Sequence, residues 1–311
     1  MNRNISQESI ITSQKEVEKE PGSRCSGCDR VAKNIPEHSL PSERDHVKEL
    51  FEELGLDMEK MNPNILRKLL LLNERTEIFK DEERSVHVAR ALFKYYEENF
   101  PDSRFTDTEQ RIVLIGTMFT DIGKTGPCNT TPEQEELMLD IYGVENIADP
   151  QKITLEEFIN DNFSGDAENR LIVLRELGIG RGMTMREFYN LHPKWTLETI
   201  IGDGVPPEAV AAAATHHMLE GINPEEIVDK DGRFTRYFGD NVSFDRAEKL
   251  IIILDKYDAF RRRGKKEHKE SIELVRNKIK SNHNFAEDRE FEELLENLDA
   301  MLSADDRAYE E

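Results

Sequence analysis

Apolar residues recur three or four positions apart over most of this chain, and strand-like alternation of apolar and polar residues is scarce. A period near 3.6 residues is typical of helices that bury one face. The clearest example runs from about Glu82 to Asn99, and its apolar stripe consists of Val86, Ala89, Leu92, Phe93 and Tyr96. Phe100 and Pro101 end this segment, because proline disfavours continuation of a helix. The sequence therefore predicts an all-α fold.

The same periodicity predicts further helices over residues 109–119, 155–162, 184–191, 196–201, 208–217, 244–262, 268–280 and 287–302. Residues 129–181 differ, since they are acidic and interrupted by proline and glycine, and we interpret them as a partly helical insertion. We expect one helical domain over residues 44–285 that contains this insertion, followed by an acidic C-terminal helix and tail over residues 286–311. Residues 1–43 are rich in Ser, Lys, Glu and Pro, which predicts a disordered polar tail.

The charge balance restricts the partners that we expect. The chain has 64 acidic and 42 basic side chains in 311 residues, a formal net charge of −22. Such a charge repels polyanions and disfavours binding to nucleic-acid polymers or anionic membranes, but it does not exclude a small phosphate ester. No apolar stretch is long enough to span a membrane, and the N-terminus lacks an apolar signal segment.

The chain contains three cysteines, which are too few for a disulfide framework, so a cytoplasmic location is the expectation. Cys25 and Cys28 have the spacing of half a zinc site, but only His38 and His46 lie near them in the sequence. We interpret Cys25 and Cys28 as tail residues without a structural ion.

Several histidines and carboxylates fall on or beside predicted helices. Glu83 and His87 are four residues apart, so they share one helix face and could reach a common ion. Asp121 and Lys124 lie on a glycine-containing turn after a buried helix, a suitable position for a site. The alternative for this turn is an ordinary helix end at Gly123.

His216 and His217 follow four alanines that permit close helix packing, so we expect them to be half-buried. Adjacent residues on a helix point about 100° apart, which would suit two neighbouring ions better than one. Asp255 and Asp258 share a face of an apolar helix, where a carboxylate is costly unless an ion or a salt bridge to Arg261 or Arg262 stabilises it. Imidazole with carboxylate and no thiolate favours iron, manganese or zinc, and two or more such ions could activate water against a phosphodiester.

Taken in order, these residues resemble the HD-GYP branch of the HD-domain metal-dependent phosphohydrolases over roughly residues 80–280. The matching elements are Glu83 and His87, the run Asp121-Ile-Gly-Lys124, His192-Pro193, His216-His217 and the Asp255-Lys-Tyr-Asp258-Ala segment. The resemblance implies an HD-type helical bundle that hydrolyses a nucleotide-type phosphoester, usually a cyclic dinucleotide in this family.

The resemblance also implies roles for individual residues. Asp121 would bridge two ions, usually iron or manganese, and Lys124 would bind the phosphate or protonate the leaving group. Arg262 and Arg263, together with Lys124, would contact the substrate. The remaining metal ligands would be Glu83, His87, His192, His216, His217 and Asp255.

The chain departs from the family pattern at several places. Thr120 occupies the position of the histidine in the His-Asp pair, the Gly-Tyr-Pro signature is missing, and the 129–181 segment is longer than usual. These departures leave two alternatives to an active phosphohydrolase with incompletely occupied metal positions. One is a catalytically degenerate protein that binds a nucleotide or a partner, and the other is a helical scaffold with relic histidines.

Overall fold

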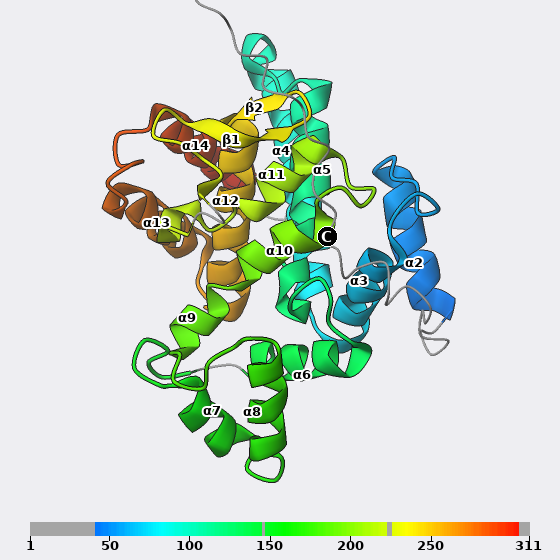
Figure 1. Ribbon diagram of the computed structural model, residues 1–311. Coiled ribbons are helices and arrows are strands. Elements are labelled where there is room, and N and C mark those ends of the chain that lie inside the picture. Colours follow the sequence, from blue (N-terminus) through cyan, green and yellow to red (C-terminus); the bar gives the residue numbers. More distant parts are fainter. Residues whose placement is uncertain (1–40, 145–146, 223–225, 305–311) are drawn as a thin grey trace, which may run out of the picture.

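A computed structural model describes residues 41–144, 147–222 and 226–304 (Figure 1). The fold is all-α, as the periodicity predicts, and the strands in the described residues form one two-stranded sheet. The predicted tail falls almost entirely outside the described residues, as do Cys25 and Cys28. Cys128 is buried and disulfide-bonded.

Four helices form the centre of the molecule: α4 (Ile78–Asn99), α5 (Asp107–Phe119), α11 (Pro207–Ala214) and α12 (Arg246–Asp258) (Figure 1). Gly116 explains how closely α5 approaches its neighbours. A β-carbon at this position would lie 2.8 Å from the Ile251 side chain of α12 and 3.1 Å from the Ala212 side chain of α11. Glycine and the alanines of α11 therefore permit the close packing that the alanine run predicts.

Two pairs of helices flank this centre. On one side lie α2 (Pro41–Glu53) and α3 (Pro63–Arg75), and on the other lie α13 (His268–Ser281) and α14 (Arg289–Ala304) (Figure 1). Helix α14 begins close to the expected boundary at residue 286, but it belongs to the same packed unit as the central helices. Its apolar face packs into the same core as α4 and α12 through Phe291, Leu294, Leu295 and Leu298.

The insertion contains α6 (Pro132–Tyr142), α7 (Leu155–Asn162) and α8 (Ala167–Glu176), followed by α9 (Met185–Tyr189). These helices enclose a small core of their own that extends to Trp195, beyond the expected end of the insertion. Threonine capping boxes begin α6, α7 and α9, in which the threonine accepts from a backbone N–H and a Glu or Gln three residues later accepts in return. Local capping explains how such short helices are stabilised. Figure 1 shows α7 and α8 in a lobe at the bottom of the view.

Helix α10 (His192–Ile200) connects this lobe to the central helices. The strands β1 (Arg233–Phe238) and β2 (Asn241–Ser243) pair antiparallel. Single turns of 3₁₀ helix occur at η1 (Pro101–Ser103), η2 (Ile122–Thr125) and η3 (Met218–Glu220), and a π turn, η5 (Ala259–Arg263), follows α12.

One correction to the expected helices matters for the site. The helix predicted over residues 208–217 ends at Ala214, before the histidine pair. His216 and His217 therefore do not have the 100° separation that is expected of adjacent residues on a helix.

Candidate metal site

Three histidines from two separate segments meet in the interior. His192 is the first residue of α10, and His216 and His217 follow the end of α11. Each offers a ring nitrogen, and these atoms all lie within 4.8 Å of one another. The Nε2 atoms of His192 and His216 are only 3.0 Å apart. We refer to His192, His216 and His217 as the histidine cluster.

The hydrogen bonds of two of these rings define where their protons lie. The Nδ1 of His192 lies 2.7 Å from the carbonyl oxygen of Tyr189, and the Nδ1 of His216 lies 2.6 Å from that of Ala213. Because a carbonyl oxygen only accepts, each Nδ1 carries the hydrogen and each neutral ring presents a bare lone pair at Nε2. Backbone carbonyls commonly orient metal-binding histidines in this way.

Two lone pairs that face each other at 3.0 Å repel unless a cation or a proton lies between them. Two imidazoles on one zinc-like ion, with bonds of ~2.0–2.1 Å, have their nitrogens roughly 2.9–3.4 Å apart for angles between 90° and 109°. The observed separation fits two ligands of a single ion.

Burial keeps His216 and His217 in the neutral form that binds metal. Removal from water, followed by the neighbouring His192, lowers the pKa of His216 to about 3. Burial and then the Lys256 ammonium hold the pKa of His217 well below its usual range. Both rings are thus uncharged at neutral pH and can donate a lone pair without first losing a proton.

A carboxylate completes the group. Asp121 Oδ1 lies 3.4 Å from His192 Nε2 and 3.8 Å from His216 Nε2. Burial opposes ionisation of Asp121, but Lys124, which forms an ion pair with it, and then His192 hold its pKa well below the usual range. The histidine cluster together with Asp121 could therefore hold a metal ion.

Gly123 explains how the Asp121 turn approaches His192. A β-carbon at residue 123 would lie 2.0 Å from the carbonyl oxygen of His192, so only glycine permits this contact between η2 and α10. Thr196 stabilises the same contact. Its hydroxyl accepts a hydrogen bond from the N–H of Gly123 at 3.1 Å and donates one to the carbonyl oxygen of Thr120 at 2.8 Å.

The site opens into a cavity of about 380 Å³. Asp255 of α12 lines it, and the Lys256 ammonium lies 2.7 Å from Asp255 Oδ2. Burial opposes ionisation of Asp255, but Lys256 and then His216 lower its pKa. Asp258 is stabilised by salt bridges, which was the alternative to a metal ion. It forms ion pairs with Arg84 at 2.8 Å and with Arg262 at 3.9 Å.

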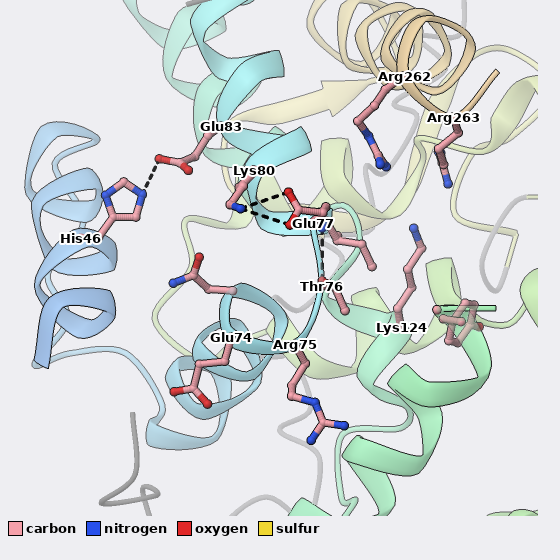
Figure 2. A pocket seen from close by; sticks show the side chains of 14 residues that line it. His46, Glu74, Arg75, Thr76, Glu77, Lys80, Glu83, Lys124, Arg262 and Arg263 are labelled. Carbon is pink, nitrogen blue, oxygen red and sulfur yellow. Dashed lines mark hydrogen bonds and ion pairs between the residues drawn. The ribbon is translucent and has the colours of Figure 1, made fainter. Parts of the chain in front are cut away.

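A larger cavity of about 670 Å³ adjoins the first, and Lys124, Tyr142 and Arg263 line both. Figure 2 shows Lys124 and Arg263 pointing toward one another across the larger cavity. Arg262 lines only the larger cavity and forms an ion pair with Asp81. Of the expected substrate contacts, Lys124 and Arg263 therefore reach the histidine side, and Arg262 does not.

The structure does not bring Glu83 and His87 to the histidine cluster. Glu83 turns toward α2, where its Oε1 lies 2.7 Å from His46 Nε2 (Figure 2). His87 is exposed and lines a separate cavity with Glu83 and Arg90. The two residues share one face of α4, as their spacing predicts, but that face lies away from Asp121.

Glu82, the preceding residue, occupies the interior position. It is 4% exposed, and its Oε1 accepts from the backbone N–H of Asp121 at 3.1 Å. Burial and then Asp121 raise its pKa well above the usual range. Glu82 lies four residues before Val86 on the predicted apolar stripe, so a carboxylate within that stripe was the signal that could have identified it.

Thr120 is buried beside Glu82. Its hydroxyl lies 2.9 Å from the carbonyl oxygen of Thr117 and 3.4 Å from Glu82 Oε1. The position that carries an imidazole in the HD-GYP pattern therefore donates hydrogen bonds here instead of offering a nitrogen ligand.

Comparison of the chain with protein-family models, with curated proteins and with solved structures found no match. The resemblance to HD-GYP proteins therefore rests on the residues alone. Among the described residues, no helix combines the length and the apolar character needed to cross a membrane.

Proposed function

We propose that this protein is a metal-dependent phosphohydrolase that acts on a small nucleotide-type phosphoester. The observation that carries the proposal is the pair of Nε2 lone pairs of His192 and His216, fixed 3.0 Å apart beside Asp121. The donor set of imidazole and carboxylate suits iron, manganese or zinc, and the resemblance favours iron or manganese.

A bound ion at such a site would lower the pKa of a water ligand and polarise a phosphoryl oxygen. Asp121 and Lys124 would have separate roles beside the ion. Asp121, held ionised by Lys124, supplies negative charge to the ion. Lys124 lies at the junction of both cavities, where its ammonium can bind a phosphoryl oxygen or give a proton to the leaving oxygen.

The lining of the two cavities indicates which chemical groups the substrate carries besides its phosphate. Lys124 and Arg263 place positive charge beside the histidine cluster in a chain whose net charge is −22. The insertion and helix α9 together supply an apolar wall, which includes the rings of Tyr142 and Tyr189 with centroids 5.4 Å apart. A phosphate attached to a flat organic group such as a nucleobase suits this combination. A cyclic dinucleotide, the usual HD-GYP substrate, is one such compound.

The test is hydrolysis of bis-p-nitrophenyl phosphate by full-length protein loaded with manganese, iron or zinc. Asp121→Asn should reduce the rate at least 100-fold, on the order expected when a group that stabilises developing charge is lost. His87→Ala should keep the rate within about twofold, because the structure places His87 away from the cluster. Equal loss in both variants would contradict the proposed site.

Thr120 favours a second candidate function, a regulatory protein that binds a nucleotide or a partner without turnover. Its hydroxyl is engaged by Thr117, so one imidazole of the HD-GYP pattern is replaced by a group that binds metal poorly. Metal-loaded protein that binds nucleotides in calorimetry but leaves them intact over many hours would establish this alternative.

A further inference from the structure

The wall of the cavity beside the histidine cluster carries more positive than negative charge. Two carboxylates line this cavity, and each is already paired with a lysine: Asp121 with Lys124, and Asp255 with Lys256. The side chains of Arg186 and Arg263 line the same cavity and add further positive charge. A second divalent ion would therefore find no carboxylate on this wall that lacks a cation.

The carboxylate of Asp255 is engaged by a lysine and not by the histidines. Its Oδ2 lies 2.7 Å from the Lys256 ammonium, and within the described part of the chain it forms no ion pair with the histidine cluster. On the far side of Asp121, Arg263 also lines the small space beside Glu82, so this carboxylate has a cation nearby as well. The histidine cluster with Asp121 therefore suits one ion, and Asp255 stabilises a cation that belongs to the chain.

That cation, Lys256, is buried at the cavity wall. It is 6% exposed, lies on α12 and lines the cavity. Glu220 Oε1 lies 3.4 Å from its ammonium, so two carboxylates stabilise the buried charge. After burial itself, Lys256 is the largest cause of the low pKa of His217, which shows that the ammonium is close to the histidine cluster. An ammonium has three N–H donors, so one remains for a ligand in the cavity.

We propose that the Lys256 ammonium is the second cation of this site and binds the phosphoryl group of the substrate beside a single metal ion. The inference rests on the proposed function, because the phosphoryl group is that of its substrate. Paired divalent ions hold a phosphoryl group from two sides in many hydrolases, and a fixed ammonium supplies the same kind of charge. Thr120 offers no nitrogen to a second ion, and Lys256 provides positive charge in its place. Lys256 is not among the substrate contacts that the HD-GYP resemblance implies.

The first test counts the metal ions. Mn²⁺ is titrated into metal-free full-length protein, and electron paramagnetic resonance follows the bound fraction. Wild type should saturate at one Mn²⁺ per chain, and His216→Asn should weaken this binding at least 10-fold, because it removes a ligand. Two Mn²⁺ of comparable affinity in wild type would overturn the inference.

The second test uses inorganic phosphate as the probe, measured by calorimetry with the Mn²⁺-loaded protein. Lys256→Gln should weaken phosphate binding at least about 10-fold, because a hydrogen bond from a charged donor is lost. The KM for bis-p-nitrophenyl phosphate should rise by a similar factor. Mn²⁺ affinity should not fall, because the substitution removes a positive charge near the ion. A purely structural role for Lys256 would weaken the binding of both ions together.

Lys278→Gln is the matched control. The Lys278 ammonium lies 3.4 Å from the same Glu220 oxygen as Lys256, but its side chain is 43% exposed and does not line the cavity. This variant should bind phosphate within about twofold of wild type. Wild-type phosphate affinity in Lys256→Gln, or an equal loss in both lysine variants, would overturn the inference.

Two further outcomes separate the inference from the proposed function and from misfolding. If wild type binds one Mn²⁺ and phosphate but hydrolyses no phosphodiester, the proposed function fails while Lys256 remains a phosphate ligand. If Lys256→Gln does not fold, the double variant with Asp255→Asn removes the carboxylate left without its lysine and gives the same phosphate readout.

Discussion

The histidine cluster and the buried ion cluster formed by Arg67, Lys68 and Glu135 both place polar groups in the interior. In the ion cluster, Glu135 Oε1 lies 2.6 Å from Arg67 and 3.0 Å from Lys68, and all three side chains are nearly inaccessible. The Lys68 ammonium also donates to Thr125, Pro127 and Thr130. The Lys68 ammonium is thus surrounded by acceptors from the chain itself, although Arg67 Nε and Glu135 Oε2 make no hydrogen bond.

The histidine cluster differs in its surroundings. The Nε2 atoms of His192 and His216 face each other at 3.0 Å, and His217 Nδ1 is buried without a hydrogen bond, 3.5 Å from Glu220 Oε2. A cavity adjoins this group, whereas the ion cluster is enclosed between α3, η2 and α6. Buried charges that pair with one another connect elements of the fold, and buried ring nitrogens that face a cavity mark a place for a ligand.

The ion cluster should give the largest effect on stability. Glu135→Gln leaves Arg67 and Lys68 buried without a countercharge, and removal of one partner of a buried ion pair costs about 3–5 kcal/mol. Urea denaturation should show this loss in the free energy of unfolding. Glu136→Gln is the control, because Glu136 is exposed and forms a surface ion pair with Arg75 at 3.6 Å. This substitution should cost less than about 0.5 kcal/mol. Similar values for the two variants would contradict the comparison.

Glu248 tests a buried carboxyl that has hydrogen bonds but no ion pair. Its oxygens accept from the Asn241 amide at 2.6 Å and the Asp245 N–H at 3.1 Å, and burial followed by Asp245 raises its pKa to about 8. Because the folded state holds this proton above pH 4.5 and the unfolded state does not, stability falls as pH rises from 4.5 to 8, by about 1.4 kcal/mol per pH unit.

Glu248→Gln mimics the protonated acid and should remove this dependence. The variant should be more stable than wild type by about 3 kcal/mol at pH 7 and equal to it below pH 4.5. Denaturation curves at several pH values measure the difference. Parallel pH profiles for the two proteins would show that Glu248 is ionised in the folded state.

His216→Asn should give a smaller change, and in a different property. The asparagine amide can still donate to Ala213, but the Nε2 lone pair is lost, so affinity for zinc or manganese should fall 10–100-fold or more, about 1.4–2.8 kcal/mol. The metal-free protein should lose less than about 1.5 kcal/mol of stability, because the hydrogen bond to the Ala213 carbonyl can be kept. A loss as large as that of Glu135→Gln would mean that the histidines are structural.

Much of the fold and part of the site could be predicted from the sequence. Long apolar stripes predicted α4, α5, α12 and α14, because local periodicity determines which face of a helix is buried. The histidine pair and Asp121 were identified because imidazoles after an alanine run and an acid on a glycine turn are unusual positions. The short hairpin β1–β2 was missed, since its two strands have little alternation.

The remainder depends on contacts between distant segments. Spacing showed that Glu83 and His87 share a face of α4, but it could not show which face meets Asp121. The ion cluster was also missed, because Lys68 and Glu135 are joined only when α3 packs on α6. A single charged residue in an apolar stripe, as with Glu82, is the local signal that indicates a buried partner.

The smallest effect on stability is expected at Glu83, which is partly exposed, whereas the adjacent residue Glu82 is buried against Asp121. Glu83 pairs with His46 at a site where the two side chains are 27% and 48% exposed, and such exposed pairs contribute about 0.2–1 kcal/mol. Glu83→Gln should therefore lower the free energy of unfolding by less than about 1 kcal/mol, and by less still in 1 M salt, where screening is strong. Its metal content should equal that of wild type, measured on the same preparations. A metal loss in Glu83→Gln as large as that expected for His216→Asn would show that the ligand-bearing face of α4 is the one predicted from sequence spacing, one residue away from the face that the structure buries against Asp121.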